Sequence, residues 1–277
     1  MSASSRARFA EVVRTDPVDL ALACLLVAAE VEPDLDPAPY LAQLDGLARD
    51  ARGDVEPGAR PAQAADGLRR ALGARAGFGG TGEDYLDIRS SLLPEVLTRR
   101  RGLPILLSVV WLEVARRLAV PAYGVGLPGH FVVAVGPPNG EHQLVDPFAG
   151  GRLLSEPDAE RLVHETTGRE LTRSDLEPRA PADILLRVLA NLRARGADGD
   201  RSIETARARL WAVELSLLLP RHPAGLRGER GELLARLGDY AGGAAELDAY
   251  AEAIAPVDPS TAETALRQAR MARARLN

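Results

Sequence analysis

The feature that most constrains the fold is a long apolar stretch, residues 105–118, that is followed at once by three short apolar runs. The long stretch carries its few charged side chains on one side, which is typical of a helix packed in a core. The short runs are separated by Pro, Gly and Asn-Gly turn signals and cover residues 122–127, 130–135 and 143–146. A buried helix followed by a small antiparallel sheet indicates an α+β fold.

Helical periodicity surrounds this centre on both sides, so we expect a mostly helical chain. Helices are expected over residues 6–14, 17–30, 40–52, 62–74, 92–100, 156–167 and 183–195. Asp16 precedes a proline and should cap the second of these helices, and Ser90 or Ser91 should cap the helix over residues 92–100.

Two segments beside the central module carry signals that can accompany anion binding. Residues 77–82, GFGGTG, are rich in glycine. Neither a preceding strand nor a following Gly-Lys-Ser/Thr completes a phosphate-binding loop, so a flexible connector is expected. Arg99, Arg100 and Arg101 end a predicted helix, where cations complement the helix dipole. An anion-binding edge is the alternative interpretation of this run.

The C-terminal part contains a repeat. WAVELSLLLPRHP and YAEAIAPVDP end alike, and Pro220 and Pro256 recur with a spacing close to the period of tetratricopeptide helix pairs, about 34 residues. The tetratricopeptide pattern is matched by Leu237, Gly238, Tyr240, Ala244 and Tyr250. About two repeats fit between Ile203 and Pro256, and a last helix over 261–276 should cap the stack with a polar face.

These patterns predict three regions. Residues 1–83 form an N-terminal helical region that packs on the core, residues 84–178 form the α+β core, and residues 179–277 form the tetratricopeptide-like helical domain. The length allows for this, since domains commonly contain about 100–150 residues. Two repeats alone bury little apolar surface, so we expect them to pack on the core.

Composition excludes several classes of protein. The net charge is −5, and Arg carries all the positive charge because the chain contains no Lys. The chain therefore has no overall field that attracts nucleic acid. The single cysteine, Cys24, excludes an intramolecular disulfide and a multi-cysteine metal site, and its apolar surroundings predict a buried, inert thiol. The apolar run at 20–29 is too short to span a bilayer. We therefore expect a cytoplasmic protein that binds neither nucleic acid nor membrane.

Two residues of the central module stand where a catalytic pair could form. His130 begins the second apolar run, and Asp146 ends the third, immediately before Pro147. Singly, they would be a strand-end histidine and an Asx turn; their order along the chain favours a pair in which Asp146 orients His130. His142 follows a turn and should be solvated. Without a third ligand it forms no zinc site, so neither a metal nor a cofactor is expected.

The order of these elements resembles the transglutaminase-like, papain-related core: a helix that starts with a nucleophile, a strand that starts with His, and a strand that ends in Asp-Pro. In that family the nucleophile is a Cys in a Gly-x-Cys at the helix N-terminus, activated by the helix dipole and the His. The resemblance implies catalytic roles for His130 and Asp146. It places the Gly-x-Cys on Gly102-Leu103-Pro104.

Three strings together give a closer resemblance. RRRGLPILLSVVWLEVARRL, GLPGHFVV and LVDPFAGGRLLS look like the bacterial SirB-type proteins, which join a transglutaminase-like domain to tetratricopeptide repeats. The resemblance extends from about Asp16 to the C-terminus. It implies a core without the catalytic Cys, as Pro104 shows in this chain.

Pro104 has no ionisable group and cannot form an acyl-enzyme. Ser108 lies about 6 Å further along the helix axis, and we expect its hydroxyl to bond back to a helical carbonyl. The leading prediction is therefore a non-catalytic binding or regulatory protein whose helical repeats bind an unknown protein or peptide. One alternative is a cysteine-independent amide or ester hydrolase, or an acyltransferase, that uses His130 and Asp146 with Ser108 or water. Another is a structural partner subunit.

Overall fold

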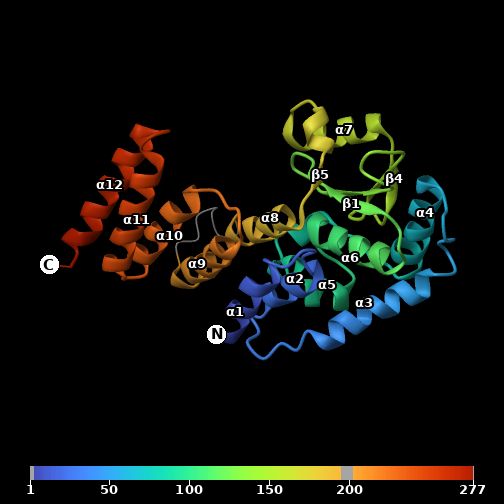
Figure 1. Ribbon diagram of the computed structural model, residues 1–277, viewed down its shortest axis with the longest axis horizontal. Coiled ribbons are helices and arrows are strands. Elements are labelled where there is room, and N and C mark those ends of the chain that lie inside the picture. The colour runs from blue at the N-terminus through green and yellow to red at the C-terminus, as the bar shows by residue number, and fades with distance from the viewer. Residues whose placement is uncertain (1–2, 195–201, 277) are drawn as a thin grey trace. The chain divides into compact units, whose positions relative to one another are not determined.

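The computed structural model describes residues 3–194 and 202–276, and the chain divides into two compact units (Figure 1). The first unit contains Pro17–Val188. The second contains Arg6–Asp16 together with the described part of Leu189–Asn277. Each unit has its own buried apolar side chains, so each is described by itself.

The units differ from the expected regions in two places. The division falls between Val188 and Leu189, inside helix α8 (Pro181–Ala194), and most of helix α1 (Ala3–Val12) belongs to the second unit. The expected N-terminal region and core form one unit because α2 (Leu20–Ala28), with its neighbours, packs on α6 (Pro104–Arg117). Pro181 begins α8, and that helix continues through the division.

The central sheet confirms the α+β class. Within the described residues, five antiparallel strands lie in the order β4-β3-β2-β1-β5. They are β1 (Ala122–Val125), β2 (Val132–Val135), β3 (Gln143–Asp146), β4 (Arg152–Leu154) and β5 (Pro178–Arg179). The register pairs Val125 with Val132 and Val133 with Val145. The three inner strands were predicted, whereas the very short edge strands β4 and β5 were not.

Both faces of the sheet are covered. Helices α4 (Pro61–Leu68) and α6 pack on one face, and α7 (Glu156–Thr167) lies along the other (Figure 1). The cluster under α7 consists of Val125, Leu127, Val132, Ala134, Leu144, Leu154, Ala159 and Val163. Burial on both sides explains why the strands read as short continuous apolar runs rather than as alternating patterns.

Several helix starts differ from the prediction. Helix α2 is capped by Asp19, which accepts a hydrogen bond from the Leu22 N–H (2.9 Å), and not by Asp16. Helix α3 (Ala38–Ala51) agrees with the prediction, whereas α4 continues as a π-helix over Arg69–Arg75. Helix α5 (Leu93–Arg99) has no side-chain cap, because its N-cap residue is Leu92. Ser90 and Ser91 end the preceding 3₁₀ helix, and the Ser90 hydroxyl donates to Asp84 (2.9 Å).

The second unit contains two helix pairs among its described residues. They are α9 (Ile203–Leu218) with α10 (Gly225–Arg236), and α11 (Tyr240–Ile254) with α12 (Pro259–Ala274). The two predicted repeats are present, but the last helix is the second member of a pair and not a separate cap. Its alanines pack on α11: Ala262, Ala265, Ala269 and Ala272.

Helices α10 and α11 meet through glycines. A Cβ atom at Gly243 would lie 2.7 Å from the Gly231 carbonyl oxygen, and one at Gly228 would lie 2.7 Å from the Tyr250 ring. Arg230 of α10 forms ion pairs with both neighbouring helices: it contacts Glu246 of α11 (2.6 Å) and Glu214 of α9 (3.4 Å). Backbones therefore approach closely, and charged side chains bridge the outer surface.

In the part of the chain that the structure describes, no helix is long and apolar enough to cross a membrane.

Candidate functional site

The structure brings His130 and Asp146 together. His130 Nε2 lies 2.9 Å from Asp146 Oδ1, and the two residues are only 6% and 3% exposed. Strands β2 and β3 are antiparallel, so the segment that enters β2 lies beside the end of β3. His130 itself precedes the strand by two residues instead of beginning it, because it lies in the turn from β1.

Asp146 is held through one oxygen of its carboxylate, Oδ1, which faces His130 Nε2. Its Oδ1 also accepts from the backbone N–H of Phe148 (3.0 Å) and of Ala149 (3.4 Å), which is the geometry of the expected Asx turn. The Phe148 ring then meets the His130 ring edge-on, with 5.9 Å between centroids. The pair is therefore fixed by the turn that follows β3 as well as by the sheet.

Arg187 of α8 fixes the turn that carries His130. Its Nη2 donates to the carbonyl oxygens of Leu127 (3.0 Å) and His130 (2.6 Å), and its guanidinium lies 5.5 Å from the centroid of the Phe131 ring. Burial lowers the pKa of Arg187, and the nearby charge of Arg179 lowers it further. Sequence reasoning missed Arg187, since nothing in the local pattern of α8 indicates bonds to a distant turn.

The glycine-rich segment packs against the site. Gly79 N–H donates to the Arg100 carbonyl (3.1 Å), and Gly80 N–H donates to the Phe148 carbonyl (2.9 Å). A Cβ atom at Gly80 would lie 2.1 Å from the Phe148 ring. Position 80 therefore needs glycine for close packing against Phe148, and the expectation of a flexible connector was wrong.

A buried carboxylate, Asp84, organises the next segment. It is 1% exposed and accepts hydrogen bonds from Thr81 N–H (2.8 Å), Ser90 Oγ (2.9 Å) and Arg101 Nη2 (3.2 Å). Burial alone would raise the pKa of Asp84, but these donors outweigh it and hold the pKa below its ordinary value.

The neighbouring Tyr85 ring packs edge-on against Phe148, with 5.7 Å between ring centroids. Burial and the negative charge of Asp146 raise the pKa of the Tyr85 phenol. The Asp84 network therefore places an aromatic side chain over the residues around His130.

The three consecutive arginines bind groups within the protein. Arg99 pairs with Asp87 (2.9 Å), and Arg101 pairs with Asp84 (3.2 Å). Arg100 donates to the Ala76 carbonyl and lies 5.9 Å from the centroid of the Phe78 ring. This pattern favours a structural role over an anion-binding edge.

The position expected for a nucleophile holds none. Pro104 is the first residue of α6 and is buried. The Ser108 hydroxyl is also buried and makes no hydrogen bond to any described residue. The expected bond to a helical carbonyl was therefore wrong, and Ser108 does not bond to His130 either. Cys24 is buried in α2, where burial raises the pKa of its thiol, and the charges of Glu113 and Asp19 raise it further.

The two ring nitrogens of His130 differ in their hydrogen bonding. Nε2 faces Asp146, while Nδ1 makes no hydrogen bond to the residues that the structure describes. His142 is exposed, as expected, and its Nδ1 lies 3.1 Å from the Gly140 carbonyl oxygen. No group of three or more His, Cys, Asp or Glu side chains within residues 3–194 and 202–276 is placed to hold a metal ion.

Comparison with known families agrees with both parts of the chain. Residues 38–190 match the transglutaminase-like superfamily, and residues 203–277 match the tetratricopeptide repeat. The first match contains His130, Asp146 and Pro104, so the described geometry belongs to a transglutaminase-like core.

Curated relatives extend the similarity over most of the chain. A UPF0162 protein of Xylella fastidiosa is 34% identical over 252 residues, which is 86% of this chain and 85% of the relative. A UPF0162 protein of Pseudomonas aeruginosa is 39% identical over 180 residues, 64% of this chain and 65% of the relative. F-box only protein 21 of Mus musculus is 30% identical over 141 residues, which is 48% of this chain and 22% of that protein.

Proposed function

The chain belongs to the transglutaminase-like superfamily and to the UPF0162 family of bacterial proteins, and we propose that it is a binding or regulatory protein that performs no acyl transfer. The observation that carries this proposal is Pro104 at the start of α6. Acyl transfer through an enzyme intermediate needs a nucleophilic side chain next to a base, and proline offers none.

One hydroxyl and one thiol elsewhere in the first unit support the same conclusion. Ser108 and Cys24 are both buried, and neither makes a hydrogen bond to His130. A thiol with a raised pKa remains protonated and is a poor nucleophile. His130 and Asp146 then serve to join the turn before β2 to the end of β3.

We place the binding role in the second unit. Tetratricopeptide repeats commonly mediate protein–protein interaction, and the described residues of this unit form two helix pairs. The partner is then a protein or a peptide. The matched stretch in F-box only protein 21 is a minor part of a longer chain, which supports use of that stretch as a module. We also propose a cytoplasmic location, in keeping with a single, unpaired cysteine.

One observation favours a second candidate function. Asp146 orients His130 through Nε2 and leaves Nδ1 without a described partner, which is the arrangement of a general base that could activate water. The second candidate is therefore an amide or ester hydrolase that uses His130, Asp146 and water. A structural partner subunit is the third, in which the pair only stabilises the fold.

Active-site probes distinguish these functions. Native protein would be treated with a fluorophosphonate and with iodoacetamide, and adducts would be read by intact mass. We expect no adduct on native protein and one iodoacetamide adduct, on Cys24, in urea. A stoichiometric adduct on native protein that is lost in His130→Ala would contradict the proposal.

Hydrolysis by water leaves no adduct, so a second assay is needed. A panel of p-nitrophenyl esters and peptide anilides would be incubated with wild type and with His130→Gln. We expect equal, background rates. A wild-type rate that falls at least about tenfold in His130→Gln would establish the second candidate, since general-base catalysis typically contributes about 10²–10⁴-fold.

A further inference from the structure

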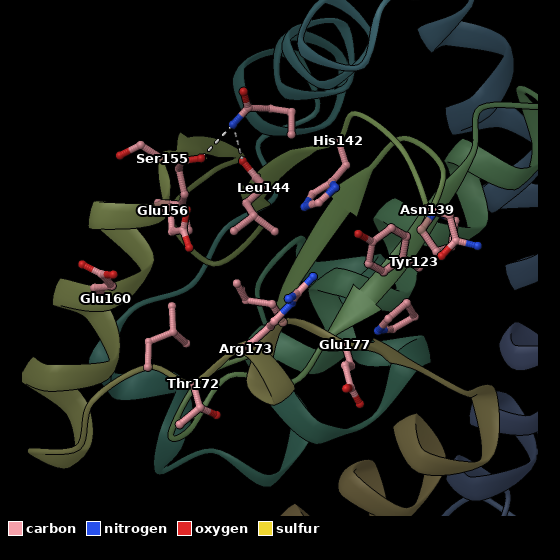
Figure 2. A pocket seen from close by; sticks show the side chains of 16 residues that line it. Tyr123, Asn139, His142, Leu144, Ser155, Glu156, Glu160, Thr172, Arg173 and Glu177 are labelled. Atoms are coloured by element: carbon pink, nitrogen blue, oxygen red, sulfur yellow. Dashed lines mark hydrogen bonds between the residues drawn. The ribbon is translucent and has the colours of Figure 1, made fainter.

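A cavity of about 780 Å³ lies on the face of the sheet that α7 covers, and neither His130 nor Asp146 lines it (Figure 2). Its walls come from strands β1, β3 and β4, from the turn before β3, from the start of α7 and from the segment over residues 171–178. Ligand cavities for small molecules commonly measure about 300–1,000 Å³. The cavity is thus large enough for a small organic molecule or a short peptide.

Part of the cavity is apolar. Leu144 and Leu154 reach it from the sheet, and Leu171 and Leu176 reach it from the facing segment. All four belong to, or pack against, the apolar cluster under α7. A ligand with an aliphatic group would therefore contact leucine side chains here and remove apolar surface from water.

Three polar side chains converge in the cavity. Tyr123, His142 and Arg173 point toward one another in Figure 2. His142 Nδ1 is occupied by the Gly140 carbonyl (3.1 Å), which leaves Nε2 for a ligand. In the described part of the chain, neither the Tyr123 hydroxyl nor the Arg173 guanidinium makes a hydrogen bond or ion pair. A guanidinium beside a phenol is suited to a carboxylate, which it can bind through two parallel N–H donors.

Carboxylates line the same cavity. Glu156 and Glu160 come from α7, and Glu177 comes from the facing segment, where it points away from Arg173 (Figure 2). None of the three forms an ion pair with a residue that the structure describes. A ligand with only negative charge would be repelled by the three carboxylates, and a ligand with only positive charge would be repelled by Arg173. A zwitterion can place its negative group at Arg173 and its positive group at the carboxylates.

We propose that this cavity binds a short peptide as a zwitterion. Its terminal carboxylate is bound by Arg173 and Tyr123, its terminal ammonium faces Glu156 and Glu160, and its aliphatic C-terminal side chain packs on the leucines. This inference goes beyond the proposed function and does not rest on it, because the cavity shares no residue with the His130 site or with the helical repeats.

The test is isothermal titration of the full-length protein with Ala-Leu, Ala-Ala-Leu and Ala-Ala-Ala-Leu. Their common C-terminus keeps the carboxylate and the leucine, while their length varies the position of the ammonium. At least one peptide should bind with a stoichiometry of one. Its C-terminal amide and its N-acetyl form should each bind about tenfold more weakly or worse, as a lost charge-assisted hydrogen bond implies.

Arg173→Ala should weaken the binding peptide by about tenfold or more, and Tyr123→Phe by a smaller factor. Arg169→Ala is the matched control, because Arg169 is an exposed arginine of the same region that does not line the cavity. Arg173 is exposed and unpaired in the described structure, so thermal unfolding of Arg173→Ala should match that of wild type. The proposal is overturned if no peptide saturates the protein at 10 mM, if the amide or N-acetyl form binds as well, or if Arg173→Ala changes nothing.

Discussion

In the first unit, several titratable side chains are buried and bonded to other segments of the chain, whereas in the second unit charged side chains lie at helix surfaces and pair across helices. Asp84, His130 and Asp146 are almost fully buried and bonded. Arg230 instead stays about a third exposed between Glu214 and Glu246. The core of the second unit is formed by close contact of small residues, as between Gly231 and Gly243.

This difference predicts which kind of substitution most lowers the free energy of unfolding of each unit. A buried polar group that loses its partner costs about 1–3 kcal/mol, whereas an exposed ion pair contributes about 0–1 kcal/mol. The first unit should therefore depend on single hydrogen-bonded residues and the second on backbone packing. Each unit contains one tryptophan, Trp111 or Trp211. Single-tryptophan variants, in which the other is replaced by Phe, report unfolding of each unit separately.

The largest loss in free energy of unfolding is expected from Gly243→Val in the second unit. A side chain at this position would collide with the Gly231 carbonyl. Overpacking typically costs about 1–3 kcal/mol in the free energy of unfolding, and a collision with backbone atoms puts this change at the upper end, about 3 kcal/mol. Urea unfolding followed by Trp211 fluorescence measures it.

The control for this prediction is Gly225→Ala. A Cβ atom at Gly225 meets nothing within 4 Å, so this change should be neutral or stabilising by up to about 1 kcal/mol. A loss below about 1 kcal/mol in Gly243→Val would refute dependence on close helix contact.

The next effect is expected from Asp84→Ala in the first unit. The change leaves Ser90, Thr81 and Arg101 without their acceptor, and it should reduce the free energy of unfolding by about 2–3 kcal/mol. Trp111 fluorescence during urea unfolding is the measurement. Asp50→Ala is the control, since Asp50 is exposed and surface changes usually stay within about 0.5 kcal/mol. Equal losses in the two variants would contradict the role of the network.

A smaller effect is expected for the coupling free energy between two side chains, which can be measured for one pair in each unit. A double-mutant cycle on His130 and Asp146 should give a coupling of about 1.5 kcal/mol, because the hydrogen bond is buried and involves a carboxylate. The same cycle on Arg230 and Glu214, which are 3.4 Å apart and partly exposed, should give at most about 0.5 kcal/mol. Equal couplings would remove the distinction between the units.

The smallest effect is a pH dependence. The pKa of Asp84 is below its ordinary value in the folded protein, so the folded state binds fewer protons at this group than the unfolded state. The stabilisation is therefore complete above the unfolded pKa, about 3.9, and is lost as pH falls through the lower folded pKa. The difference in unfolding free energy between wild type and Asp84→Asn should shrink below about pH 4. A constant difference from pH 6 to pH 3 would be inconsistent with the lowered pKa.

Features that depend on local pattern were predictable from the sequence. The apolar periodicity of residues 105–118 indicated α6, which begins one residue earlier, at Pro104. The Asn-Gly turn and its flanking apolar runs indicated β2 and β3. Family resemblance then singled out His130 and Asp146, which the antiparallel pairing brings together.

Features that depend on distant partners could not be predicted. Ser90 is a residue type that often caps helices, but the N-cap of α5 is Leu92, and the Ser90 hydroxyl donates to the buried carboxylate of Asp84. From the sequence, Gly80 is indistinguishable from a glycine in a connector, whereas in the fold the Phe148 ring packs directly against it. Arg187 reads as one charged residue on an amphipathic helix, and its bonds to Leu127 and His130 follow only from the tertiary fold.

The bonds from Arg187 to the His130 turn have a consequence for synthesis of the chain on the ribosome. Strands β2 and β3, with His130 and Asp146, leave the ribosome before α8 does. Until Arg187 emerges, the carbonyl groups of Leu127 and His130 lack the donor that they have in the finished fold. Contacts between distant segments also form late, because closing a long loop costs entropy before the contact forms. The His130 turn is thus completed near the end of translation of the first unit, and a nascent chain that stops before α8 would carry an unsupported turn.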